Sequence, residues 1–159
     1  DPVMKVNPPL RTARDIEAIK AGIAEGVITM LATDQAPHPP QAKETDFASA
    51  AFGMVSIECA VPLYRRALID DGVIGWSDLV RLMTVAPAAL TGLDARGLGS
   101  LTIGGPGDVS IIDPDLSWTI HAHDFRSTGR NCPFEGMEVT GRAIGAVVAG
   151  DVRWELQRR

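Results

Sequence analysis

The sequence has only two cysteines, Cys59 and Cys132, and they share no Cys-x-x-Cys spacing. Two thiols are too few for a disulfide framework, so a reducing, cytoplasmic compartment is expected. No apolar run approaches the ~18 residues that a membrane-spanning helix needs. Long basic runs are also missing, and the formal net charge is −5. These features argue against nucleic acid and anionic membranes as partners.

The composition is that of a folded domain. The 159 residues are 45% apolar and 22% charged, which permits a sizeable core and excludes a disordered chain. Apolar, strand-like residues follow the opening Asp1-Pro2 at once. Because natural domains rarely begin so abruptly, we expect a piece of a longer chain, with a true start at Met4 as the alternative.

The first third has the pattern of a strand, a helix and a second strand. Val3–Val6 predicts a short strand, which ends at tandem prolines because proline cannot donate to a ladder. Thr12 is a suitable N-cap for a helix with an isoleucine stripe that stops at Gly26. The apolar run Val27–Leu31 predicts a second, buried strand. Together these elements predict a parallel βαβ unit.

A carboxylate and an imidazole follow the second predicted strand. Asp34 stands at its end, and His38 lies four positions on in a proline-rich loop. Barrel enzymes place catalytic and metal-binding groups at such strand ends. The alternative is that Asp34 caps the next turn and His38 is a solvated loop residue. The connection from Gln35 to Ala51 has little periodicity, and loops of that length are usually functional or mobile.

Helices are expected in the middle of the chain and strands in its last third, where glycines from Gly97 onward break the chain into turns. The expected helices run from about Gly53 to Asp71 with a kink at Pro62, from Asp78 to about Val85 with Ser77 as cap, and from Pro87 to Gly92. The expected strands are Val109–Ile112, Trp118–Ile120, Val139–Val148 and Val152–Glu155, the last two joined by a turn at Gly150-Asp151.

His121-Ala-His123 has the spacing of a metal-binding pair, because alternation along a strand would put both rings on one face. Asp124 and Phe125 after it resemble the start of a capped turn, and nearby sequence implies no third ligand. We therefore interpret the two histidines as a solvated strand end.

Five segments together resemble a known family. The sequence is similar to the last third of class I dihydroorotases, in the amidohydrolase superfamily, over essentially the whole chain and in the same order. The first two matching segments together are specific, whereas the Gly-Asp-Val run marks only the superfamily. The segments are Lys5-Val-Asn-Pro-Pro-Leu-Arg11, Thr33-Asp-Gln-Ala-Pro-His38, Phe52-Gly-Met-Val55, Gly107-Asp-Val-Ser-Ile-Ile-Asp113 and Asn131-Cys-Pro-Phe-Glu-Gly136.

The resemblance implies an α/β fold with two parts. Residues 1–96 would be the C-terminal part of a (β/α)8 TIM barrel, with its last two βα units. Residues 97–159 would belong to a small composite β domain whose N-terminal residues lie outside this chain. Val3–Val6 would then be the seventh barrel strand and Val27–Leu31 the eighth.

The resemblance also implies roles for single residues. Asp34 matches a catalytic metal ligand that carries a proton to the leaving amide nitrogen. His38 matches the imidazole that holds the substrate carboxylate, and Asn7 matches a side chain that hydrogen-bonds the pyrimidine ring. Backbone groups around Ala51 and Gly53 match those that contact the ring amides. The implied substrate-binding residues are Asn7, His38, Ala51, Phe52 and Gly53.

The implied activity is zinc-dependent, reversible hydrolysis of dihydroorotate to N-carbamoyl-aspartate in pyrimidine biosynthesis. The other ligands of the binuclear zinc site would lie upstream, so we expect the 159 residues alone to be inactive and to need the missing barrel segment as a partner. A homo-oligomer or a complex with aspartate transcarbamoylase is compatible with this reading.

Two positions depart from the family pattern. Gln35 stands where the family usually has His, and Ala51 stands where it usually has Pro. The departures permit a catalytically silent, dihydroorotase-like subunit that scaffolds aspartate transcarbamoylase. A hydantoinase or allantoinase is the alternative within the enzyme class.

Overall fold

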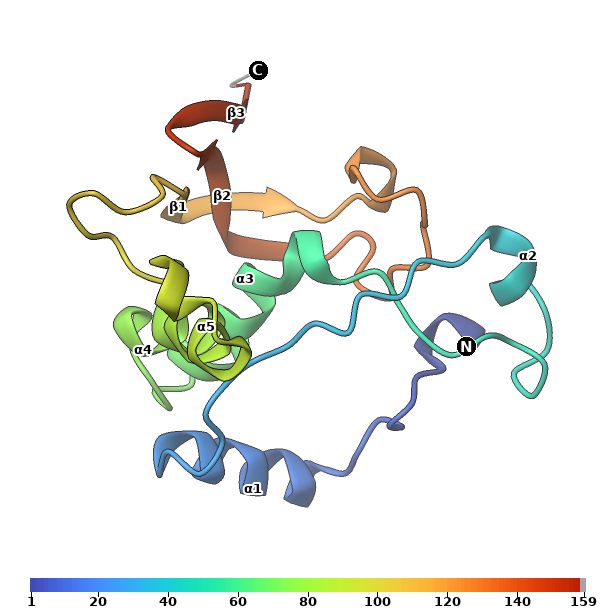
Figure 1. Cartoon of the computed structure of the whole chain (residues 1–159). Helices are drawn as coiled ribbons and strands as arrows, with labels where there is room; N and C mark the ends of the chain where they lie inside the picture. The colour runs from blue at the N-terminus through green and yellow to red at the C-terminus, as the bar shows by residue number, and fades with distance from the viewer. Residues whose placement is uncertain (158–159) are drawn as a thin grey trace.

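The computed structural model describes residues 1–157. A small sheet lies over α3, α4 and α5, while α1 lies at the far end from the sheet and α2 near the N-terminus (Figure 1). The helices are α1 (Ala13–Ala24), α2 (Pro40–Lys43), α3 (Ala60–Tyr64), α4 (Trp76–Met83) and α5 (Val85–Thr91), and the strands are β1 (Val109–Thr119), β2 (Glu138–Val148) and β3 (Asp151–Glu155). Shorter segments are the 3-10 helices Pro2–Met4, Ile57–Cys59, Asp94–Arg96 and Ala122–Asp124 and the π-helix Arg65–Ile69.

The sheet is antiparallel with the order β1-β2-β3. The two strands predicted before Ile120 form one strand, β1, with an irregularity in the register between Asp113 and Ser117. The Asp113 carboxylate accepts hydrogen bonds from the backbone N–H groups of Asp115 and Leu116, which stabilises this bulge. The β2–β3 turn uses Ala149 and Gly150, both with positive φ, one residue earlier than predicted.

The predicted start of α1 is confirmed. The Thr12 hydroxyl accepts from the Asp15 N–H, and the Asp15 carboxylate accepts from the Thr12 N–H, which makes a capping box. Of the isoleucine stripe only Ile23 is buried, whereas Ile16 and Ile19 are about half exposed. The apolar face of α1 is therefore only partly covered by the described residues.

The two predicted parallel strands do not form ladders. Val3–Val6 overlaps the 3-10 helix Pro2–Met4, and Val27–Leu31 is assigned no strand. A strand needs a hydrogen-bonding neighbour on at least one side. The N–H groups of Val27 and Ile28 donate back to Gly22 O in α1, and the bond from Leu31 N to Leu82 O, 3.1 Å long, is too little to make a ladder. The βαβ prediction is therefore wrong for the ladder, within residues 1–157.

The predicted helix from Gly53 to Asp71 begins later and changes type along its length. Pro62 lies in the first turn of α3, where its missing N–H breaks no helical bond, so the predicted kink is absent there. The irregularity lies further on, in the π-turn closed by the bond from Asp70 N to Arg65 O.

The next two helices differ from prediction at their starts. Gly75 rather than Ser77 is the N-cap of α4, and α5 begins at Val85, two residues before Pro87. Gly92 ends α5 in the left-handed conformation, as expected for a C-terminal glycine.

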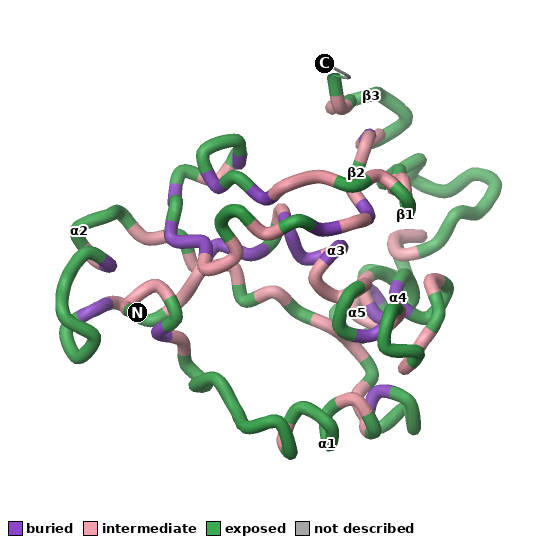
Figure 2. The backbone as a smooth tube through the Cα atoms, turned by 180° about the vertical axis from the view of Figure 1, so that it is seen from behind, coloured by how far each residue is buried: buried purple, intermediate pink, exposed green. Residues whose placement is uncertain are grey.

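Two apolar clusters hold these elements together. One, which contains Val55, Cys59, Ile120 and Val139, joins the sheet to the segment that leads into α3. The other joins α1, the π-helix and α4 through Ile23, Leu68 and Leu82. Figure 2 shows that buried residues gather in these regions, whereas the path from Lys5 to α1 is largely exposed. Within residues 1–157, no helix is both long and apolar enough to cross a membrane.

Candidate active site

Asp34 lies just beyond the extended segment Val27–Leu31, as predicted. Its side chain is exposed and its φ is +46°, in the left-handed region that few residues other than glycine adopt. Aspartate tolerates this conformation better than most residues, and unusual backbone geometry of this kind concentrates at functional sites. Among residues 1–157, Asp34 takes part in no ion pair. The carboxylate is therefore available to a metal ion.

Gln35 fixes the backbone next to Asp34. Its Oε1 accepts hydrogen bonds from the N–H groups of Ser56 and Ile57, at 2.8 and 2.9 Å. Its Nε2 donates to the hydroxyl of Ser127 at 3.2 Å. The amide thus joins the loop after the extended segment to the start of the helical region and to the segment before β2. Gln35, which stands where the family usually has His, therefore uses both its amide oxygen and its amide nitrogen in hydrogen bonds.

His38 contacts the predicted ring-binding segment. Its Nε2 lies 2.8 Å from the carbonyl oxygen of Phe52. Since a carbonyl oxygen only accepts, Nε2 carries the proton and donates, which leaves Nδ1 as the ring nitrogen open to a ligand. The contact brings together two segments to which the resemblance assigns substrate binding. Asn7 is exposed.

Asn131 holds this loop together and is itself buried, with 6% of its surface exposed. Its Oδ1 accepts from the His38 N–H at 3.0 Å. Its Nδ2 donates to the carbonyl oxygens of Ala36 and Gly53, at 3.0 and 3.2 Å. The sequence marked this residue as part of a family segment without giving it a role. Its contacts lie about ninety residues away in sequence, a separation that no local pattern reveals.

Gly53 sits where only glycine fits. Its φ is +126°, and a Cβ there would lie 2.4 Å from the Cβ of Ala36. Its N–H donates to the carbonyl oxygen of Lys5 at 2.9 Å, two residues before Asn7. Ala51 N donates to Ala42 O at 2.9 Å. The segments around residues 5, 36–38, 42 and 51–53 are therefore packed together by direct backbone contact.

His121 and His123 lie just beyond the end of β1, in and beside the short helix Ala122–Asp124, which agrees with the interpretation of a solvated strand end. His123 is almost fully exposed, and His121 Nδ1 lies 3.1 Å from Glu135 Oε1. The Ala122 N–H, and then His121, hold the pKa of the Glu135 carboxyl below its usual value. Among residues 1–157, no three His, Cys, Asp or Glu side chains form a metal-binding group.

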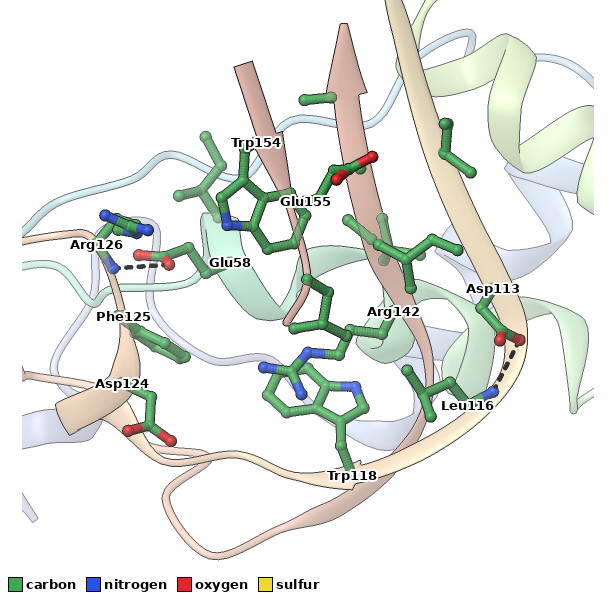
Figure 3. A pocket seen from close by; sticks show the side chains of 18 of the residues that line it. Glu58, Asp113, Leu116, Trp118, Asp124, Phe125, Arg126, Arg142, Trp154 and Glu155 are labelled. Atoms are coloured by element: carbon green, nitrogen blue, oxygen red, sulfur yellow. Dashed lines mark hydrogen bonds between the residues drawn. The ribbon is translucent and has the colours of Figure 1, made fainter. Parts of the chain in front are cut away.

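A large open cleft of about 1750 Å³ lies along one face of the sheet. Figure 3 shows Trp118 and Arg142 stacked within it, and the Arg142 guanidinium lies 4.3 Å from the centre of the Trp118 ring. On its opposite wall, the Glu58 carboxylate accepts from the N–H groups of Arg126 and Ser127. Gln35 also lines the cleft, so the loop that contains Asp34 and the sheet border the same cleft.

The mixed α/β fold and the exposed aspartate at the end of an extended segment agree with a match to a known family. The chain belongs to the amidohydrolase family, whose model matches residues 5–153.

The chain is also similar in sequence to several dihydroorotases. The dihydroorotase of Geobacter sp. (strain M21) is 44% identical over 151 residues, which are 95% of this chain and 35% of that protein. The dihydroorotase of Syntrophotalea carbinolica is 41% identical over 152 residues, 96% of this chain and 35% of that protein. The chain therefore spans about a third of the length of these relatives.

The solved structure of L-hydantoinase (dihydropyrimidinase) from Arthrobacter aurescens has the same fold over nearly the whole chain. The TM-score is 0.90 at 32% sequence identity, and the match covers 99% of this chain and 35% of that one. D-hydantoinase from Thermus sp. gives a TM-score of 0.85 at 24% identity, which supports the fold alone.

Proposed function

We propose that this chain supplies the C-terminal part of a zinc-dependent dihydroorotase, which hydrolyses dihydroorotate reversibly to N-carbamoyl-aspartate in pyrimidine biosynthesis. The observation that carries the proposal is the similarity to dihydroorotases at 41–44% identity over about 95% of the chain. The exposed side chain of Asp34 and the contact between His38 and Phe52 O support it, because they leave a carboxylate and an imidazole in neighbouring parts of one loop.

In this proposal Asp34 has two roles in ring opening. Asp34 is the zinc ligand of this chain and carries a proton to the amide nitrogen that leaves. Zinc, when bound, supplies Lewis acidity and a nucleophile that is usable at neutral pH. The donor set fits, because an exposed carboxylate is a normal zinc ligand and Asp34 makes no competing ion pair among residues 1–157. The remaining ligands are expected outside the described residues.

Substrate binding is assigned to the packed segments around Asp34. His38, with Nε2 donating to Phe52 O, reaches the substrate carboxylate through Nδ1–H when both ring nitrogens are protonated. Asn7 and the backbone of Ala51, Phe52 and Gly53 provide hydrogen bonds to the ring amides. These polar contacts are specific for a cyclic amide that carries a carboxylate.

The proposed architecture divides the chain at residue 97. Residues 1–96 would complete a (β/α)8 barrel, in which Val27–Leu31 gains the strand neighbours that it lacks within residues 1–157. Residues 97–159 would be part of a composite β domain, and the open face around Trp118 and Arg142 is where its further strands would pack.

The test is a substrate panel on the complete enzyme that contains this chain. We expect kcat/KM for dihydroorotate to exceed that for hydantoin and allantoin by about a hundredfold or more, because those rings lack the carboxylate that His38 would hold. Faster turnover of hydantoin would show that the hydantoinase reading is correct. No turnover of any ring, with zinc absent from the purified protein, would favour the silent subunit that scaffolds aspartate transcarbamoylase.

A further inference from the structure

Lys43 is a buried lysine without a carboxylate partner. It is the last residue of α2, and only 4% of its surface is exposed. Among residues 1–157 it takes part in no ion pair. Burial, and then the nearby charge of Lys5, lower the pKa of its ammonium. Burying an unpaired charge is unfavourable, so its hydrogen-bond partners are the place to look for a specific role.

The ammonium of Lys43 joins two separate stretches of backbone. Its Nζ lies 2.8 Å from the carbonyl oxygen of Ala51 and 3.2 Å from that of Lys5. Lys5 O also accepts the N–H of Gly53 at 2.9 Å. One side chain thus holds the start of the segment that leads to Asn7 against the segment that is proposed to contact the substrate ring.

The segment that Lys43 holds also contacts His38. The carbonyl of Phe52, between Ala51 and Gly53, accepts from His38 Nε2. Gly53 packs so closely on Ala36 that even a methyl group would not fit between them. A displacement of the Ala51–Gly53 backbone therefore moves Phe52 O, the hydrogen-bond acceptor of His38, because these segments are in direct contact.

A second lysine stabilises the same segment from the other side. Lys5 Nζ donates to Ala48 O at 2.7 Å and lies 4.4 Å from the centre of the Phe52 ring. The carbonyl oxygen of Lys5 still accepts from the Gly53 N–H without Lys43, whereas among residues 1–157 Ala51 O has Lys43 as its donor. An apolar side chain at position 43 would fill the same space and leave that carbonyl unpaired.

We propose that Lys43 is a positioning residue for substrate binding. It fixes the backbone of Ala51–Gly53, and through Phe52 O the ring of His38, in the geometry that receives the cyclic amide and its carboxylate. It acts through these groups and not on the reacting atoms. The inference rests on the proposed function for its substrate, and on the structure alone for the link between Lys5 and Ala51.

The test compares Lys43→Met with Lys43→Arg in the complete enzyme, with Lys20→Met as control. Lys20 is a partly exposed lysine of α1 that pairs with Asp71, so the same substitution there removes the same atoms outside the Lys43–Ala51 contact. We expect Lys43→Met to raise KM for dihydroorotate about tenfold with kcat changed less than about threefold, because a binding geometry is lost rather than a reacting group. Lys43→Arg, which keeps charged donors, should recover most of that loss, and Lys20→Met should leave KM unchanged.

Amide hydrogen exchange supplies a readout that does not depend on turnover. The Gly53 amide should exchange faster in Lys43→Met than in the wild type or in Lys20→Met. If Lys43→Met does not fold, Lys43→Gln takes its place in both measurements. A wild-type enzyme that does not hydrolyse dihydroorotate would overturn the proposed function. The exchange result would still test whether Lys43 holds Lys5 and Ala51 together. Unchanged KM, or unchanged exchange at Gly53, in a folded Lys43 variant would overturn the positioning role.

Discussion

The sheet and the Asp34 loop are held in shape by different kinds of bond. β1 and β2 are joined by backbone hydrogen bonds along most of their antiparallel register, which is interrupted between Asp113 and Ser117. The loop from Leu31 to His38 depends instead on the side chains of Gln35 and Asn131, which bond to backbone groups of distant segments. A ladder distributes its stability over many bonds, whereas the loop concentrates it in a few side chains.

The two kinds of bonding predict different sensitivity to single substitutions. An exposed side chain of a sheet can be altered with little effect, because the ladder uses backbone groups that every residue except proline has. A loop that must present a carboxylate and an imidazole in fixed positions needs particular donors and acceptors, so single substitutions there should have large effects. The predictions below compare substitutions in the two regions.

The largest effect is expected at Asp34. Asp34→Asn in the complete enzyme should lower kcat by about a thousandfold or more, because it removes the proposed metal ligand and proton carrier while leaving the shape of the side chain. The free energy of unfolding should change little, because the carboxylate is exposed and makes no ion pair among residues 1–157. Asp71→Asn, at an exposed carboxylate paired with Lys20, is the control. Equal activity of the two variants would remove Asp34 from the mechanism.

The contrast between loop and sheet is tested by Asn131→Ala against Ser117→Ala. Asn131→Ala should lower the free energy of unfolding by about 3 kcal/mol, since it leaves Ala36 O, Gly53 O and the His38 N–H without their partner. Ser117→Ala removes one exposed bond to Thr140 on the sheet and should cost less than about 0.5 kcal/mol. Urea denaturation of both variants measures the difference, and similar midpoints would show that Asn131 does not organise the loop.

A smaller effect is expected from Gly53→Ala, with Gly150→Ala as its match. Both glycines have positive φ, so both variants suffer backbone strain of about 1 kcal/mol. Only at Gly53 does the new Cβ meet a neighbour, at 2.4 Å from Ala36, while nothing lies within 4 Å at Gly150. We expect Gly53→Ala to cost about 1–3 kcal/mol more than Gly150→Ala, by analogy with overpacked cores, and to weaken substrate binding. Thermal unfolding of the two proteins gives the comparison, which equal losses would contradict.

The smallest effect concerns the turn before β2. The pKa of Glu135 is lowered in the folded state, so its carboxylate stabilises the fold above its ordinary pKa of 4.5, and this stability is lost as the pH falls through the folded value. Glu135→Gln should therefore be less stable than the wild type at neutral pH and should approach it in acid. The difference should be modest because the Glu135 side chain is about half exposed. A difference that persists unchanged in acid would exclude the carboxylate as its cause.

The same contrast explains which features the sequence predicted. The N-cap at Thr12, the end of α5 at Gly92 and the late strands depend on residues close in sequence, and they were predicted with shifts of a few residues at most. The strands at Val3–Val6 and Val27–Leu31 were not found, because a parallel strand exists only with its neighbours, and apolar character alone does not supply them.

The sequence named candidate site residues but not the side chains that hold their loop in place. Spacing pointed to Asp34 and His38, and the resemblance added Asn7 and the Ala51–Gly53 segment, whose contact with His38 the structure shows. The roles of Gln35, Lys43 and Asn131 could not be foreseen, because each follows from contacts with backbone groups of other segments. A lone lysine in a short helix carries no sign that it will be buried against two carbonyl groups.

The most direct test of the account is zinc content measured together with dihydroorotate turnover, for the complete enzyme, for its Asp34→Asn variant and for residues 1–159 alone. We predict bound zinc and turnover in the complete enzyme, loss of turnover with reduced zinc in the variant, and neither in the isolated segment, whose described residues 1–157 contain no group of three metal-binding side chains. Stoichiometric zinc and turnover by residues 1–159 alone, or full turnover by Asp34→Asn, would contradict the claim that Asp34 completes a site built largely from another part of the protein.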